Sequence, residues 1–286
     1  MRWQGRRGSR NVEDRRGQRG VRPVGIGIGG VVMVLLIAWL TGANPLQLLQ
    51  VLSSSDVPSG GAVATDAPAG QPSDELGTFA SVVLASTEDA WRSLLPALGR
   101  DYQEPTLVIY HDVWPSACGM GQSAMGPFYC PADGKIYIDL SFFDEMSRRL
   151  GAAGDFAQAY VIAHEVGHHV QNLLGISAEM RRMQQGARSQ AETNELSVRL
   201  ELQADCLAGV WGHFAARDGL IEAGDFEEGL DAASAIGDDR LQRETRGRVS
   251  PESFTHGTSE QRMRWLRIGL ERGDPDHCET FGPPQV

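Results

Sequence analysis

Lysine is nearly absent from this 286-residue chain, since Lys135 is the only one and the other basic side chains are arginines. Basic residues are also scarce beyond residue 23. Residues 1–23 carry a net charge of +6, from eight arginines set against Glu13 and Asp14. Because the whole chain carries −11, the remainder carries −17. A nucleic-acid binder needs Lys and Arg to contact phosphates. The acidic body therefore argues against nucleic acid as a partner.

Charged residues are missing altogether from residues 24–40, VGIGIGGVVMVLLIAWL. As a helix this run would be about 26 Å long at ~1.5 Å per residue, close to the ~30 Å of a bilayer core. Eight arginines precede it, and the next charge after it is Asp56. The positive-inside rule then predicts a cell-membrane protein with a single-pass helix over residues 24–41, its N-terminus cytoplasmic and its body outside the cytoplasm. Two alternatives are a signal peptide cleaved after this run and a buried core helix.

Large apolar side chains are sparse in residues 53–74, where Ser, Gly, Pro and Ala dominate. Such a composition is typical of a flexible tether. The sequence thus predicts a basic cytoplasmic segment at 1–23, a transmembrane helix at 24–41, a linker at 42–75 and one folded domain at 76–286.

Within residues 76–286 the hydrophobic spacing predicts helices near 76–95, 141–150, 155–174, 192–216, 226–235 and 259–271. Strands are expected at 106–110 and 135–140, with a Gly-rich loop between them at 118–130. Asp155 is the expected N-cap of the central helix, and residues 177–191 look like a mobile excursion. The fold class is therefore α+β, mainly helical with a small sheet.

The central helix contains His-Glu-x-x-His at His164, Glu165 and His168. Residues i and i+4 share one face of a helix, so the two imidazoles can bind one Zn²⁺. Glu165 is then placed to act as general base on a water at the metal.

A catalytic zinc usually has three protein ligands and one water. The later stretch RLELQADCLAG carries Glu201 and Asp205, also at i and i+4, among small and apolar residues. Gly167 would let that helix approach closely. We expect Glu201 to be the third ligand and Asp205 to accept a hydrogen bond from a ligating histidine. The reverse assignment, with Asp205 as the ligand, stays open, as does a merely solvated helix face.

Four cysteines follow the predicted membrane segment, which favours disulfides. Three pairings are possible; we expect Cys118–Cys130, which closes a short loop, and Cys206–Cys278, which holds the C-terminal tail. The alternative for Cys206 is a zinc thiolate.

Four stretches together resemble the bacterial "putative neutral zinc metallopeptidase" family: AYVIAHEVGHHVQNLLG, SVRLELQADCLAGVW, GPFYCPADGKIYIDLSFF and FTHGTSEQRMRW. The resemblance implies a zincin-like domain, a zinc cofactor and an anchored peptidase. The order His-Glu-x-x-His then Glu-x-x-x-Asp also looks like the gluzincin pattern of membrane-associated metallopeptidases.

The expected activity is zinc-dependent hydrolysis of a peptide or protein substrate. His256 is a candidate for stabilising the oxyanion, and a structural histidine is its alternative. His169 is expected to pack just behind the ligands, and KIYIDL (135–140) to be either an edge strand that pairs with substrate or plain core. Two other functions remain open: a non-catalytic zinc-stabilised domain that binds peptides or envelope components, and a zinc amidase acting on cell-wall links. The sequence does not specify the substrate, the cleavage specificity, the oligomeric state or any gating.

Overall fold

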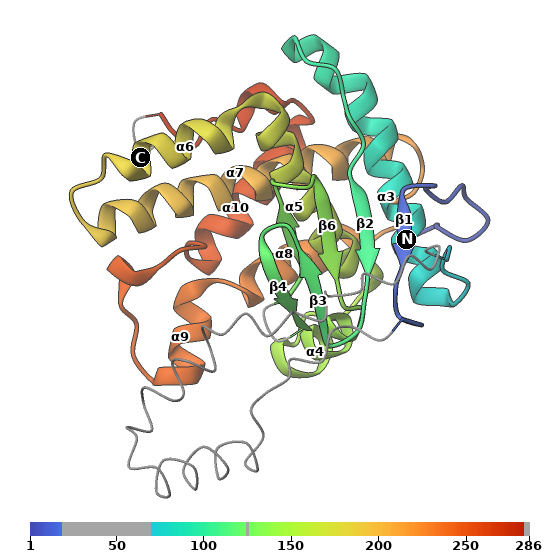
Figure 1. The fold of residues 1–286 in the computed structure, drawn as a ribbon, viewed down its shortest axis with the longest axis horizontal. Coiled ribbons are helices and arrows are strands. Elements are labelled where there is room, and N and C mark those ends of the chain that lie inside the picture. The colour runs from blue at the N-terminus through green and yellow to red at the C-terminus, as the bar shows by residue number, and fades with distance from the viewer. Residues whose placement is uncertain (19–69, 124–125, 283–286) are drawn as a thin grey trace, which may run out of the picture. The chain divides into compact units, whose positions relative to one another are not determined.

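A computed structural model describes residues 1–18, 70–123 and 126–282, which form a mainly helical α+β fold (Figure 1). Met1–Arg16 and the chain from Ala69 onward make up one compact unit. The predicted α+β class is confirmed, with small sheets beside a larger set of helices.

The main sheet has four strands in the order β1 (Val12–Asp14), β2 (Thr106–Ile109), β6 (Lys135–Ile138) and β5 (Phe128–Cys130). β1, β2 and β6 run parallel, and β5 is antiparallel to β6. A separate hairpin joins β3 (Val113–Ser116) and β4 (Gly119–Gln122). The region expected to be a loop at 118–130 thus contains paired strands. β4 has glycine at two of its four positions and β5 has only three residues, so neither shows an alternating pattern, and partner strands rather than local sequence stabilise them.

Strand β6 contains the KIYI of the predicted KIYIDL edge strand, but it lies inside the sheet between β2 and β5. Of the two roles left open for it, plain core structure is confirmed and an edge strand is not. The edges of the sheet are β1 and β5, and β5 directly precedes β6 in the chain.

The helices match most of the predicted spans. Their bounds are α3 Glu75–Leu94, α4 Ser141–Leu150, α5 Asp155–Leu174, α6 Ile176–Gln185, α7 Gln190–Arg217, α8 Asp225–Ala235, α9 Asp238–Arg246 and α10 Ser259–Arg272. Short 3₁₀ turns occur at Leu95–Leu98, Pro251–Ser253 and Pro275–His277. Two helices differ from expectation: α6 replaces the predicted excursion at 177–191, and the sequence pattern did not indicate α9.

Two helix ends have clear capping groups, and one predicted cap is displaced by a residue. Thr258 and Gln261 form a reciprocal capping box at the start of α10, and Gly175 ends α5 with a positive φ of 83°. The N-cap of α5 is Gly154, not the predicted Asp155, because the Asp155 carboxylate turns to the ammonium of Met1, 2.8 Å away.

Helix α5 is central and mostly buried, and it packs against α7, α8 and α3. Two close helix crossings bring α7 to its neighbours. A Cβ on Gly167 of α5 would lie 2.9 Å from the carbonyl oxygen of Ala204 on α7. A Cβ on Gly209 of α7 would lie 2.2 Å from the carbonyl oxygen of Leu266 on α10. Glycine at both crossings therefore lets the three helices approach backbone to backbone, as we expected for Gly167.

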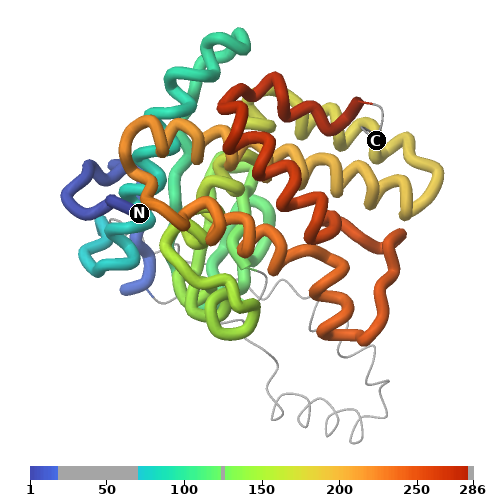
Figure 2. The backbone as a smooth tube through the Cα atoms, turned by 180° about the vertical axis from the view of Figure 1, so that it is seen from behind, coloured from blue at the N-terminus to red at the C-terminus, as the bar shows by residue number. Residues whose placement is uncertain are grey.

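Residues 1–16 are folded onto the body, which corrects the predicted boundary at residue 76. Val12 pairs with Leu107, and Trp3 packs edge-to-face on Phe79 with ring centroids 5.5 Å apart. The Arg2 amide donates to the carbonyl oxygen of Leu220, in the turn after α7, beside which Figure 2 shows the N-terminus. The predicted division at 1–23 is wrong for residues 1–16, because apolar side chains among the arginines, Met1 and Val12, reach the core.

The predicted transmembrane helix at 24–41 and most of the predicted linker lie outside the described residues. Among the helices that the structure does describe, none is long and apolar enough to cross a membrane.

Both predicted disulfides are present. Cys118 and Cys130 have Cα atoms 5.8 Å apart, and those of Cys206 and Cys278 are 5.5 Å apart. The alternative of a Cys206 zinc thiolate is therefore wrong in this structure.

Candidate metal centre

Three predicted ligand side chains meet where α5 crosses α7. His164 Nε2 lies 3.1 Å from one carboxylate oxygen of Glu201, and His168 Nε2 lies 3.4 Å from the other. The three residues offer ligand atoms within 4.8 Å of one another. Glu201 reaches the two rings because Gly167, inside the His-Glu-x-x-His turn, admits the backbone of α7.

Asp205, one turn after Glu201, lies behind His164 rather than in the ligand set. Its carboxylate accepts a hydrogen bond from His164 Nδ1 at 2.8 Å and another from the Tyr160 hydroxyl at 2.5 Å. A carboxylate that accepts from Nδ1–H holds the tautomer in which Nε2 carries a lone pair for a metal. The geometry therefore favours Glu201 as ligand and Asp205 as the group that orients His164.

Sequence reasoning missed Arg262 of α10, which completes this arrangement. Its Nε and Nη2 donate to the two oxygens of Asp205 at 2.8 and 2.9 Å, and its side chain is 3% exposed. A signal was available, because Arg262 shares its helix face with Trp265, Leu266 and Gly269. A lone charge on the apolar face of a helix needs a buried partner.

The electrostatics of the centre favour a cation. Burial alone would lower the pKa of His164, but Asp205 and Glu201 raise it to about 10. Burial would likewise raise the pKa of Asp205, yet the charge of Arg262 and the His164 ring lower it to about 2. The carboxylates of Glu201 and Asp205 thus surround the two rings with negative charge, and a divalent ion that displaces the ring proton would take over as its counter-charge.

A cleft of about 390 Å³ opens onto the centre. It is lined by His164, Glu165 and Glu201 together with His256 and Arg262, and Gly126–Phe128 border it at the start of edge strand β5. Glu165 and His256 were predicted from the sequence, and the structure brings both to this one cleft.

The loop that carries His256 is held in place by Asp238. The Asp238 carboxylate accepts hydrogen bonds from the backbone amides of Thr255, His256 and Gly257, and it lies 3.4 Å from His256 Nδ1. The hydrogen bond to Asp238 raises the pKa of His256 despite partial burial. His256 thus lines the cleft with Asp238 favouring the protonated form of its ring.

His169 lies elsewhere than predicted. Its Nε2 donates to the Gln103 carbonyl at 2.5 Å, and its Nδ1 accepts from the Tyr129 hydroxyl at 3.0 Å. Both ring nitrogens are used to join α5 to the sheet side of the domain, so His169 does not orient a metal ligand.

The donor set fits zinc. Two imidazole nitrogens and one carboxylate, with a cleft on the open side, match a catalytic zinc site, whereas a structural site closes its fourth position with a protein ligand. His164, His168 and Glu201 would hold the ion.

Comparison with known proteins agrees with this centre. The family model described as "putative neutral zinc metallopeptidase" matches residues 1–281. "Uncharacterized protein YpfJ" of Escherichia coli (strain K12) is 53% identical over 289 residues, covering 99% of each chain. "Uncharacterized protein Mb2605" of Mycobacterium bovis is 38% identical over 258 residues, covering 85% of each. No solved structure matches this chain.

The family match spans the folded unit from β1 to the tail beyond α10, and zinc is the cofactor that this family implies. A chain that matches over this length belongs to the "putative neutral zinc metallopeptidase" family.

Proposed function

We propose that this protein is a zinc-dependent peptidase that hydrolyses peptide bonds with Glu165 as general base. The observation that carries the proposal is the position of Glu165. Glu165 lines the cleft together with His164 and Glu201. A closed structural zinc site has no use for a carboxylate there.

When bound, Zn²⁺ polarises a carbonyl group and lowers the pKa of water toward ~7. Glu165 takes the proton of the attacking water and delivers it to the leaving amine. His256 is suited to donate a hydrogen bond to the oxyanion, because Asp238 favours its protonated form. Asp205 keeps His164 in its metal-binding tautomer.

Substrate is proposed to bind along β5. This strand lies at one edge of the sheet, so among the described residues one side of its backbone has no neighbouring strand. It begins at Phe128, which borders the cleft. An extended peptide that pairs with β5 would run toward Glu165. This proposal gives β5 the substrate-pairing role that was one of the two alternatives for KIYIDL.

The test is peptide-library cleavage by the purified full chain. Glu165→Gln keeps the size of the side chain and removes the base, so we expect a loss of at least about 10²-fold in turnover with zinc still bound. Glu179→Gln, at an exposed glutamate on α6, is the matched control and should cleave normally. Cleavage that survives both Glu165→Gln and a chelator would refute the mechanism. Zinc binding without any cleavage would favour a non-catalytic binding domain, and cleavage of cell-wall amides alone would favour an amidase.

We also propose that the body lies outside the cytoplasm, associated with a membrane through residues 24–41. Two disulfides, which persist in oxidising compartments, support the extracytoplasmic location. The expected cytoplasmic position of residues 1–16 conflicts with their folding onto the body, because a bilayer cannot divide one folded unit.

A further inference from the structure

The second histidine of α5 has a buried hydrogen-bond partner beyond the ligand set. His168 Nδ1 lies 2.9 Å from Oε1 of Gln171, which is fully buried. Nε2 of Gln171 donates to the Leu200 carbonyl at 2.7 Å and to Oε1 of Gln203 at 3.1 Å. The partner of His168 is therefore itself tied to α7.

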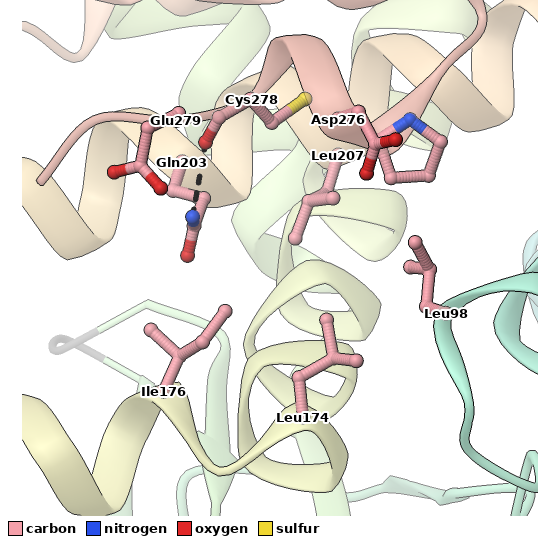
Figure 3. A pocket seen from close by; sticks show the side chains of 9 residues that line it. Leu98, Leu174, Ile176, Gln203, Leu207, Asp276, Cys278 and Glu279 are labelled. Atoms are coloured by element: carbon pink, nitrogen blue, oxygen red, sulfur yellow. Dashed lines mark hydrogen bonds between the residues drawn. The ribbon is translucent and has the colours of Figure 1, made fainter. Parts of the chain in front are cut away.

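The chain of hydrogen bonds continues to the C-terminal tail. Nε2 of Gln203 donates to the carbonyl oxygen of Cys278 at 2.9 Å, the bond drawn in Figure 3. Cys278 is joined to Cys206 of α7 by a disulfide. The Thr280 hydroxyl also donates to the Arg199 carbonyl at 2.6 Å. The carbonyl that ends the chain of hydrogen bonds is thus held against α7 by covalent and polar contacts.

Two backbone carbonyls decide the direction of every bond in this chain. A carbonyl oxygen only accepts, so Gln203 must turn its NH₂ group to Cys278 and its oxygen to Gln171. Gln171 then faces the Gln203 oxygen and the Leu200 carbonyl, and it must direct its NH₂ group at both. Its own oxygen is left for His168.

This polarity selects the tautomer of His168. An amide oxygen facing Nδ1 requires a proton on that nitrogen. Nε2, which faces Glu201, is then left with the lone pair that a metal needs. Asp205 has the same effect on His164, but there a carboxylate acts directly.

We propose that Gln171 and Gln203 are positioning residues that hold His168 in its metal-binding tautomer and orientation, and that the Cys206–Cys278 disulfide sets zinc affinity through them. The inference rests on the role of His168 as a zinc ligand in the proposed function. It does not depend on which bond the enzyme hydrolyses.

The first test measures the zinc dissociation constant of the full chain by competition with a chromophoric chelator. Gln171→Leu removes the acceptor and should weaken zinc binding by about 10- to 100-fold, as is usual for partners of metal ligands. Gln171→Glu keeps an oxygen toward Nδ1 but sets a carboxylate against the Leu200 carbonyl. It should melt at a lower temperature and still bind zinc within about threefold of the native chain.

A merely structural role for Gln171 would make zinc affinity fall together with the melting temperature in both variants. Native zinc affinity in Gln171→Leu, or equal weakening in Gln171→Glu, would overturn the proposal. His168→Ala tests separately the assumption that His168 is a zinc ligand. If that variant binds zinc as tightly as the native chain, the ligand assignment itself fails.

The second test compares the two disulfides. The double variant Cys206→Ser/Cys278→Ser should bind zinc several-fold more weakly, whereas Cys118→Ser/Cys130→Ser should match the native chain, because that bridge lies in the strand region away from the tail. Equal zinc affinity in both double variants would overturn the link to the disulfide. If the first double variant does not fold, Gln203→Leu tests the same link, and an unchanged affinity there would count against it.

Discussion

The Asp205 carboxylate joins three helices through its hydrogen bonds. It lies on α7, accepts from Tyr160 and His164 on α5, and pairs with Arg262 on α10. Its exposure is 0%. A buried carboxylate is stable only when hydrogen bonds and an opposite charge offset its desolvation. At the residue scale, metal-ligand orientation and domain stability therefore depend on the same group.

Replacing Arg262 tests how strongly the free energy of unfolding depends on this ion pair. Arg262→Met keeps much of the apolar stem but leaves the Asp205 charge buried and unpaired, so we expect a loss of about 3–5 kcal/mol in the free energy of unfolding. Urea unfolding of the apo protein measures it. Arg264→Met, at an exposed arginine on the same helix, should change stability by no more than about 0.5 kcal/mol. Equal effects of the two variants would contradict the proposed role of the ion pair.

Gly167 lies at the helix crossing that brings Glu201 to the two histidine rings of the candidate metal centre. Gly167→Ala would press a methyl group against the Ala204 backbone, and overpacking of this kind costs about 1–3 kcal/mol. Because the strain displaces α7, zinc affinity should fall as well. Gly186→Ala is the matched control, since a Cβ there meets ordinary contacts from 3.5 Å outward. Calorimetry and chelator competition on both variants would show whether only Gly167 affects the metal.

At the scale of elements, the start of α3 is tied to the N-terminal segment. Asp74 caps α3 by accepting from the Gly77 amide, and it also pairs with Arg16. The hydrogen bond from Arg16 lowers the pKa of Asp74 to about 2, outweighing its partial burial. The pairing thus links the strand at residues 12–14 to the helix that covers it.

This pairing should make the free energy of unfolding decrease as the pH falls. A carboxyl group whose pKa is depressed on folding stabilises the native state above its unfolded pKa of ~3.9, and the contribution is lost as pH falls toward about 2. Asp74→Asn keeps a good N-cap and removes the charge. The difference in unfolding free energy between the native chain and this variant should therefore be largest near pH 6 and shrink below pH 4. Asp101→Asn, at an exposed aspartate, should show no such trend; a pH-independent difference for Asp74→Asn would contradict the assignment.

For the whole molecule, the packing of residues 1–16 bears on membrane topology. Val12 is 3% exposed within the sheet, and the Met1 ammonium lies 2.8 Å from Asp155 at the start of α5. Residues 1–16 and the chain from residue 70 onward thus share one core. They must lie on the same side of any membrane to which the protein is attached.

Cysteine labelling in intact cells tests this arrangement. The four native cysteines are all paired, so Gln4→Cys and Glu271→Cys each introduce a single free thiol at an exposed site. A membrane-impermeant maleimide should label both variants or neither. Labelling of Glu271→Cys alone would contradict the shared core and support the single membrane crossing expected from residues 24–41.

Several features were predictable from the sequence because they depend on spacing along one element. His164 and His168 share a face through the helical repeat, and Glu201 and Asp205 do so on α7 for the same reason. The spans of α3, α5, α7 and α10 followed from apolar periodicity. The strands β1, β3, β4 and β5 did not. Charged residues, proline or glycine interrupt β1, β3 and β4, and β5 has only three residues, whereas β2 and β6 are mostly apolar.

The sequence alone pointed to His164, His168 and Glu165 through the His-Glu-x-x-His spacing, and it limited the third ligand to Glu201 or Asp205 and the cysteines to three pairings, of which it favoured one. Tertiary structure decided which carboxylate faces the metal, because only the crossing at Gly167 places Glu201 against both rings and Asp205 behind one of them. It also decided the roles of Arg262, Gln171 and residues 1–16. Apart from His168, which lies three residues before Gln171, the partners that define these roles are distant in sequence, and a contact of that kind leaves no periodic trace along the chain.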